Sequence, residues 1–146
     1  MSNVSSACDL CDGDGGQLVF RNDGYRVVLV DEAAYPGFCR VIWNAHVKEM
    51  TDLSPADRAA VMQAVWAVEA AVREVMQPEK INVASLGNMT PHVHWHVIPR
   101  YADDAHFPSP VWAEARRGTP AATLEQRRAK LPQLRTAIER HLATPS

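Results

Sequence analysis

The sequence predicts an α+β domain built on a mainly antiparallel sheet, and three observations carry this prediction. Five short stretches are rich in β-branched and aromatic residues, one long stretch repeats apolar residues at helical spacing, and several connections have hairpin length. Of the 146 residues, 47% are hydrophobic and 22% are charged, a balance typical of a compact chain that can bury a core. We expect a single domain over residues 1–146, with a core at roughly 8–101 and a C-terminal loop and helical extension at 102–146.

Three strands are expected in the first third of the chain, at residues 17–21, 26–30 and 38–43. The first two are separated by a short segment in which Asn22, Asp23 and Gly24 tolerate the positive φ angles of a tight turn. This pattern predicts a hairpin. The third strand follows Pro36 and Gly37, a pair typical of turns, and is rich in aromatic and β-branched residues.

The clearest helix is expected to begin after Ser54, which can cap it. Pro55 suits the first helical position, and Asp57 places negative charge in the first turn. Valines then recur at steps of three and four residues, at Val61, Val65, Val68, Val72 and Val75. Pro78 ends the pattern. An amphipathic helix of this length must bury its apolar side, so we expect it to lie on the sheet.

The second half of the chain predicts two further strands, at residues 81–86 and 92–98. A helical segment is expected at 123–142, with an interruption at Pro132. The intervening residues 103–120 contain three prolines and no sustained periodicity. We therefore expect an ordered or semi-ordered surface loop there.

Charge and composition exclude several classes of partner. Lys and Arg number 15 against 17 Asp and Glu, so a formal charge of -2 offers no electrostatic basis for binding duplex nucleic acid or an anionic membrane. The apolar runs are shorter than the ~18 residues that a membrane span needs, and the first residues show no export signal. Three cysteines form an odd count, which argues against a disulfide framework. We expect a cytoplasmic protein with small substrates or protein partners.

Three of the six histidines stand at alternate positions of the stretch 92–98. Because alternate residues of a strand share one face, His92, His94 and His96 are expected on one outer, solvent-facing side at intervals of ~6.5 Å. The opposite, apolar side then carries Val93, Trp95 and Val97.

Three interpretations of this histidine row compete. The first is a solvated strand face, although random polar choices would mix Thr, Lys, Glu and Ser. The second is a metal site made of the three histidines alone, but residues four apart on a strand lie ~13 Å apart, so at most two neighbours could share one metal. The third is phosphate chemistry, in which a neutral imidazole attacks phosphorus and a neighbouring imidazole donates a hydrogen bond or proton to the oxygens.

The stretch His92-Val93-His94-Trp95-His96-Val97-Ile98 resembles the signature of the histidine triad (HIT) family, in which histidines alternate with hydrophobic residues. Further similar features are Asp31, residues 36–43, His46 and residues 82–88, so the resemblance covers roughly residues 8–101. The triad region is especially similar to bacterial members described as dinucleoside polyphosphate hydrolases. The resemblance implies a HIT-like fold, with a mainly antiparallel five-stranded sheet, one long helix and a C-terminal helical segment.

The same resemblance implies a nucleotidyl-transfer mechanism. His94, at the middle triad position, is the implied nucleophile on the α-phosphorus, and water then opens the nucleotidyl-histidine. His96 is expected to contact phosphate oxygens and to assist the leaving group, and His92 to hold the orientation of the active ring. No metal is required for this chemistry, because imidazoles can supply the positioning and the charge stabilisation.

The substrate-binding residues also follow from the resemblance. Asn82 and Asn88 match positions that face phosphate, and Gly87 lets the loop backbone approach a phosphate closely. Asp31 matches the residue that binds ribose hydroxyls, and a carboxylate can accept two hydroxyl hydrogen bonds. Asparagine is also common in turns for conformational reasons, so Asn88 has a purely structural alternative.

The cysteine pair Cys8 and Cys11 has the spacing of a metal-binding knuckle and needs two further ligands. A thioredoxin-like role would place the pair between a strand and a helix, whereas here it precedes the first strand. Several members of the HIT superfamily carry a structural zinc, and their pattern maps onto Cys8, Cys11, His46 and His92. The alternative is a pair of free thiols.

The leading hypothesis is a nucleotide hydrolase that cleaves dinucleoside polyphosphates or nucleoside phosphoramidates, in a homodimer as the family resemblance implies. A second hypothesis is a nucleotide-binding sensor or interaction module with little turnover. A third is transfer of the nucleotidyl group to an acceptor other than water. The nearest sugar-phosphate transferases have Gln at the position of His96, which counts against this third hypothesis.

Overall fold

The structure, a computed structural model, describes residues 8–143 and contains a five-stranded antiparallel sheet. In spatial order its strands are β1 (Gln17–Arg21), β2 (Tyr25–Leu29), β3 (Cys39–Trp43), β5 (His94–Arg100) and β4 (Lys80–Ala84). The predicted α+β class is therefore confirmed, and each strand lies within two residues of its predicted bounds. The histidine strand β5 lies between β3 and β4, inside the sheet.

The helical segments are α1 (Asp9–Asp12), a 3-10 turn (Met50–Asp52), α2 (Pro55–Met76), α3 (Ala121–Arg128) and α4 (Leu131–Ala143). The start of α2 is as predicted, since the Ser54 hydroxyl accepts a hydrogen bond from the Asp57 N–H. Gln77 ends α2 in the left-handed conformation, directly before Pro78. Among the helices of residues 8–143, none is long and apolar enough to cross a membrane.

The C-terminal helical segment breaks at a different place from the one predicted. The prediction puts the break at Pro132, but the chain turns at Ala129 and Lys130, and Pro132 is the second residue of α4. A proline there loses no helical hydrogen bond, because the first N–H groups of a helix have no partner within it. Residues 103–120 form the expected loop without helix or strand.

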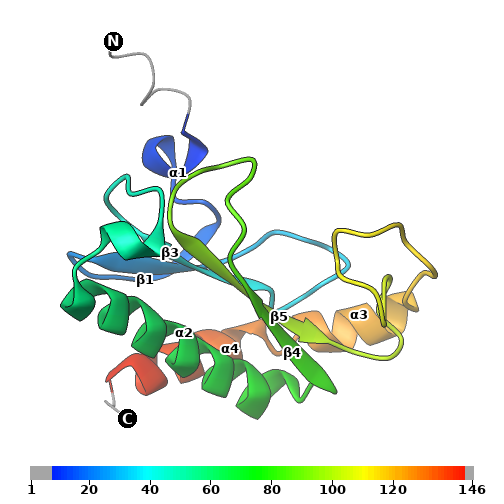
Figure 1. The fold of residues 1–146 in the computed structure, drawn as a ribbon. Coiled ribbons are helices and arrows are strands. Elements are labelled where there is room, and N and C mark those ends of the chain that lie inside the picture. The colour runs from blue at the N-terminus through cyan, green and yellow to red at the C-terminus, as the bar shows by residue number, and fades with distance from the viewer. Residues whose placement is uncertain (1–7, 144–146) are drawn as a thin grey trace.

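One face of the sheet is covered by α2 and α4, which lie together beneath it in Figure 1. Strand residues such as Val27, Val41 and Val97 are fully or almost fully buried there against the two helices. The apolar row predicted for α2 forms most of its buried side, which consists of Val61, Ala64, Val65, Val68, Ala71, Val72 and Met76. This packing is the main hydrophobic core and holds the sheet as a rigid platform.

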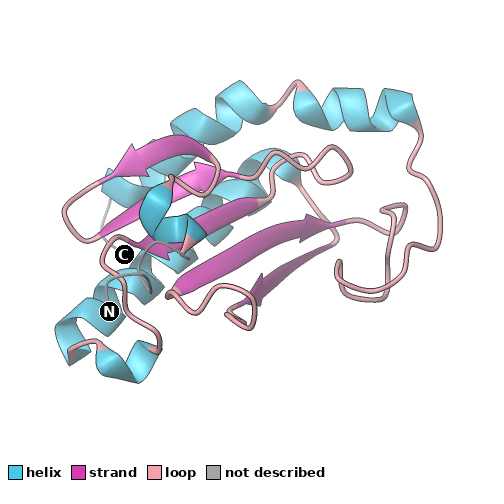
Figure 2. Cartoon of the chain, turned by 90° about the horizontal axis from the view of Figure 1, so that it is seen from above, coloured by secondary structure: helices cyan, strands magenta, loops and turns pink. Residues whose placement is uncertain are grey.

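The opposite face of the sheet carries the histidines. Arg40 pairs with His96 and Ile42 pairs with His94 across β3 and β5, and residues that pair across antiparallel strands point the same way. The N-terminal segment with α1 lies over this face, as Figure 2 shows. Two small apolar clusters cover parts of it, one formed by Cys8, Leu10, Val28 and Ile42 and the other by Tyr35, Phe38 and Ile98.

A buried ion pair fastens the loop that follows β5 onto the histidine face. Arg100 Nε donates to Asp104 Oδ2 at 2.8 Å, and both side chains are almost fully buried. The Asp104 carboxylate also accepts hydrogen bonds from the backbone N–H groups of Tyr101, His106 and Phe107. Burial alone would raise the pKa of Asp104, but these bonds hold it well below its usual value. The loop therefore stays close to the strand that carries the histidines.

Candidate active site and metal centre

The three triad histidines are buried, which corrects the prediction of a solvent-facing row. Their exposed fractions are 1% for His92, 7% for His94 and 5% for His96. The N-terminal segment and the loops cover this face of the sheet, so alternation along the strand predicts the shared side of the histidines but not their exposure. Only His94 and His96 lie within β5, and His92 precedes it.

The ring of His94 is held in one tautomer by the backbone. Its Nδ1 lies 2.6 Å from the carbonyl oxygen of His92, and because a carbonyl only accepts, Nδ1 carries the proton and donates. In the neutral ring, Nε2 then holds the free lone pair. Burial is the main cause that lowers the pKa of His94, and the positive charge of Arg40 lowers it further against the backbone hydrogen bond.

The ring of His96 is enclosed by other rings. The ring centroid of His94 lies 5.0 Å away, that of Trp112 lies 5.3 Å away and that of Phe38 lies 5.7 Å away, all with edge-on geometry. Its buried Nδ1 has no hydrogen-bond partner within residues 8–143. Burial, followed by the proximity of His94 and Arg40, lowers the pKa of His96 to about 4. The ring is therefore neutral near pH 7.

His94 and His96 open onto a pocket of about 400 Å³. The loop after β4 contributes Gly87 and Asn88 to its lining, so the structure brings these two predicted residues together with the histidines. Gly87 has a φ of 78°, a conformation that favours glycine. The Ser85 hydroxyl donates to the His94 carbonyl at 2.7 Å and ties this loop to the histidine strand.

Two other predicted residues lie elsewhere. The side-chain oxygen of Asn82 accepts a hydrogen bond from Arg100 Nη1 at 2.7 Å, so it is engaged in the network that anchors the loop after β5. Asp31 lies exposed in the connection between β2 and β3. Neither residue is part of the pocket lining.

The pocket lining also includes an arginine and a tryptophan that were not among the predicted site residues. Arg40, on β3, lines the pocket beside His96, and Trp112 reaches it from the loop after β5. An arginine at an alternate strand position and a tryptophan in a proline-containing loop have no signature of their own. Only the strand pairing between β3 and β5 could have indicated Arg40, and strand order does not follow from periodicity.

The side chains of Cys8, Cys11, His46 and His92 converge beside the triad, and their ligand atoms all lie within 4.8 Å of one another. Cys8 is the N-cap of α1 and Cys11 lies within its single turn, and His92 Nδ1 lies 3.4 Å and 3.6 Å from their respective sulfur atoms. His46 Nδ1 lies 3.3 Å from the Cys11 sulfur. Two sulfurs and two imidazole nitrogens at these separations could hold one metal ion.

The tautomer of His92 suits this group of ligands. Its Nε2 lies 2.6 Å from the Trp43 carbonyl oxygen and therefore donates to it, which leaves the Nδ1 lone pair directed at the sulfur atoms. Metal-binding histidines are commonly oriented in this way, by donating the other ring N–H to a carbonyl. The donor chemistry and the ring orientation of the four residues thus fit a metal.

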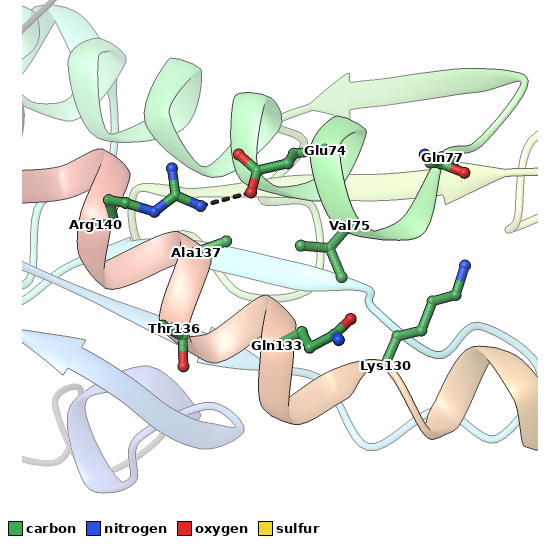
Figure 3. Close-up of a pocket in the computed structure, with 8 residues that line it drawn as sticks. All are labelled: Glu74, Val75, Gln77, Lys130, Gln133, Thr136, Ala137 and Arg140. Atoms are coloured by element: carbon green, nitrogen blue, oxygen red, sulfur yellow. Dashed lines mark hydrogen bonds and ion pairs between the residues drawn. The ribbon is translucent and has the colours of Figure 1, made fainter.

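A larger hollow of about 600 Å³ lies on the helix side of the sheet, between α2 and α4 (Figure 3). Its lining includes Glu74, Gln133 and Arg140, and Glu74 pairs with Arg140 across it. Among the described residues that line it there is no histidine or cysteine. The smaller pocket on the histidine face therefore remains the candidate active site.

The model of the HIT domain family matches residues 15–103, which is more than half of the chain, so this chain belongs to the HIT domain family. Solved structures with the same fold include a histidine triad protein from Bradyrhizobium japonicum. It is 25% identical, with a TM-score of 0.70, over 88% of this chain and 92% of that chain. The family resemblance and the HIT-like fold expected from the sequence are confirmed.

Two further solved structures are similar. A histidine triad protein from Sinorhizobium meliloti 1021 is 26% identical, with a TM-score of 0.65, over 82% of this chain and 90% of that chain. A Zn-bound histidine triad family protein from Mycobacterium smegmatis is 24% identical, with a TM-score of 0.55, over 91% of this chain and 99% of that chain. The second likeness is one of fold alone.

Curated relatives include the AP-4-A phosphorylase of Mycobacterium tuberculosis, from strains CDC 1551 / Oshkosh and H37Rv. Each is 30% identical to this chain over 78 residues. The match takes in 49% of this chain and 40% of those proteins, so this chain covers less than half the length of the curated relatives that it matches.

We predict that the His96 ring titrates near pH 4 in the free protein. Between pH 7 and pH 5 the unfolded chain takes up this proton at the ordinary pKa of 6.5, whereas the folded protein does not. Acidification over this range should therefore lower the stability of the wild type by about 2 kcal/mol more than that of His96→Asn. Titration of the ring protons by NMR and urea unfolding at both pH values measure the two quantities. An equal loss of stability in the wild type and in His96→Asn would contradict the lowered pKa of His96.

Proposed function

We propose that this chain is a nucleotide hydrolase of the HIT type, which cleaves dinucleoside polyphosphates or nucleoside phosphoramidates through a nucleotidyl-histidine intermediate. The main support is the geometry of His94. Its Nδ1 proton is held by the His92 carbonyl, and its ring lines a pocket shared with His96, Gly87 and Asn88. A nucleophile needs a free lone pair, and the fixed tautomer provides it at Nε2.

In the proposed first step, the Nε2 lone pair of His94 forms a bond to the α-phosphorus. The bond from this phosphorus to the bridging oxygen or nitrogen breaks at the same time, and the leaving group departs with its electron pair. Water then attacks the phosphorus, the P–N bond breaks, and its electron pair returns to Nε2 as the water releases a proton. His92 acts through its carbonyl, which keeps His94 in the required tautomer.

His96 is proposed to contact the phosphate oxygens and to assist the leaving group. Its ring is neutral before the substrate binds, because burial lowers its pKa to about 4. A phosphate anion nearby favours the protonated form and so raises the proton affinity of the ring. Gly87 and Asn88 are proposed to present the loop backbone and an amide side chain to the phosphates.

The family resemblance implies roles in substrate binding for Asp31 and Asn82. Asp31 is proposed to accept hydrogen bonds from ribose hydroxyls, and its exposed carboxylate is free to meet a ligand. For Asn82, its hydrogen bond to Arg100 favours an indirect role, in which it supports the strand and the loop beside the pocket.

A second candidate function is transfer of the nucleotidyl group to phosphate. The observation that favours it is the similarity to proteins named AP-4-A phosphorylase. The two reactions share the first step and differ in the acceptor, which is water in one and phosphate in the other. Cleavage of diadenosine tetraphosphate with phosphate present separates them, since attack by water gives AMP and attack by phosphate gives ADP.

We also propose a structural zinc ion held by Cys8, Cys11, His46 and His92. When bound, zinc would fasten the N-terminal turn to the segment that precedes β5, as thiolate and imidazole ligands do in structural sites. The phosphate chemistry needs no metal, because imidazoles and backbone donors supply the groups that it requires. Zinc would act on activity only through the position of His92, and so of His94.

A homodimer and a cytoplasmic location are further parts of the proposal. β4 is an edge strand, and the large apolar side chains of Val83 on β4 and Trp66 on α2 are 37% and 57% exposed. A second copy placed edge to edge along β4 would satisfy its open backbone groups. Thiol ligands at Cys8 and Cys11 suit a reducing compartment.

We predict that His94→Ala lowers the turnover of diadenosine tetraphosphate by a factor of about a thousand or more, because it removes the nucleophile. Steady-state kinetics measure the loss. His141→Ala removes a histidine of α4 that pairs with Glu74 outside the pocket, so it is the matched control and should keep wild-type turnover. Activity of His94→Ala near the wild-type level would remove His94 from this role, and tight nucleotide binding without turnover by the wild type would favour a sensor.

We predict that Asp31→Asn weakens the binding of AMP by roughly 3- to 30-fold while the binding of 2′,3′-dideoxy-AMP is unchanged. Asparagine keeps an acceptor oxygen but loses the charge, and hydrogen bonds to charged groups are worth about 1.5–3 kcal/mol against about 0.5–1.5 kcal/mol for neutral ones. Calorimetric titration measures both affinities. The adjacent exposed carboxylate gives the control Glu32→Gln, which should not alter the preference for the ribose. If Asp31→Asn keeps the wild-type preference for AMP over the dideoxy ligand, Asp31 does not bind the ribose.

We predict one zinc ion per chain in protein purified without chelator or nickel resin, and its loss in Cys11→Ser. Removal of zinc should lower the melting temperature first and turnover second, because the ion holds the fold around His92. Elemental analysis measures the content. Cys39→Ala changes a buried cysteine outside the cluster and should keep the metal. Less than about a tenth of an equivalent of zinc, with Cys8 and Cys11 both freely alkylated, is the opposing result.

A further inference from the structure

Four arginines on the sheet point to the histidine face, and one of them, Arg21 on β1, is exposed and pairs with Asp14. The other three are buried or half-buried: Arg26 on β2, Arg40 on β3 and Arg100 on β5. The guanidinium of Arg26 donates four hydrogen bonds, to three backbone carbonyls of the N-terminal segment and to one asparagine side chain. Arg100 also donates four, two of them to Asp104. The donors of both residues are thus used within the fold.

Arg40 differs from these two. Its Nη1 donates to the Gly15 carbonyl at 2.9 Å, while its Nε is buried and has no partner within the described residues. No acidic side chain between residues 8 and 143 forms an ion pair with it. A desolvated guanidinium with unused donors is costly, and an anionic ligand would supply the partner that the fold does not.

The position of Arg40 indicates which ligand this is. Arg40 pairs with His96 across β3 and β5 and lines the histidine pocket. Among the described residues of that lining, it is the one with a permanent charge. A phosphate that enters the pocket therefore meets its cation at Arg40.

We propose that Arg40 binds a phosphate group of the nucleotide in this pocket, through the guanidinium donors that the protein leaves unused. This inference rests on the proposed function and adds that the site needs the positive charge of Arg40 to bind the nucleotide phosphate. A guanidinium can hold two phosphate oxygens with parallel hydrogen bonds, which Lys and Gln cannot reproduce. Held next to His94 and His96, these oxygens are stabilised as phosphorus changes its bonding partners.

The test compares ligands that differ only in the phosphate. Calorimetric titration with AMP, adenosine and inorganic phosphate is run on the wild type, Arg40→Gln and Arg40→Lys. We expect Arg40→Gln to weaken AMP and phosphate by roughly 10- to 100-fold and to leave adenosine within about twofold, with Arg40→Lys in between. Arg128→Gln removes the same charge from α3 and should bind all ligands as the wild type does.

Each outcome decides between the two roles open to Arg40. Equal losses for AMP and adenosine, with a lower melting temperature, would assign Arg40 to the fold, since it also holds the Gly15 carbonyl. AMP and phosphate affinities unchanged in Arg40→Gln would overturn the inference, as would a wild type that binds neither ligand.

The proposed function can fail separately. A wild type that binds phosphate through Arg40 but has no affinity for AMP or dinucleotides would leave the anion site standing and remove the nucleotide. A wild type that cleaves dinucleotides with kcat/KM equal to that of Arg40→Gln would keep the proposed function and overturn the role of Arg40.

Discussion

The hydrogen bonds of His92 join three parts of this chain, and the arrangement of both candidate sites depends on them. The ring donates through Nε2 to the Trp43 carbonyl at the end of β3, so its Nδ1 lone pair faces Cys8 and Cys11. The backbone carbonyl of the same residue accepts the Nδ1 proton of His94. His92 thus directs a ring nitrogen at the sulfur atoms of the candidate metal site and also fixes the tautomer of His94. A change that rotates His92 would disturb both.

Burial of the histidine face gives the pocket its electrostatic character. Removed from water, the imidazoles of His94 and His96 lose affinity for protons, and an uncharged ring is the form that can offer a lone pair. The positive charge that phosphate chemistry requires must then come from a group that stays ionised when it is desolvated. A guanidinium meets this condition, and Arg40 stands directly across from His96. The pocket therefore divides the proposed nucleophile and the proposed phosphate-binding cation between two strands.

Much of the fold could be predicted because local patterns determine it. The cap at Ser54, the valine spacing of α2 and the alternation at β5 each reflect a short-range physical preference that the structure retains. The exposure of the histidines could not be predicted in this way, because it depends on segments far away in the sequence that cover the sheet. Asn82 shows the same limit, since its partner Arg100 is known only once β4 and β5 are paired.

The loop that carries Trp112 differs in kind from the strands that carry the histidines. Trp112 is 53% exposed, and its ring lies edge-on against His96. The Arg100–Asp104 ion pair fastens this loop to the sheet. Substitutions and changes of length beyond that anchor can alter the rim of the pocket while the sheet keeps its register. The lining that Trp112 contributes to the pocket can therefore change without a change in the strands that hold His94 and His96.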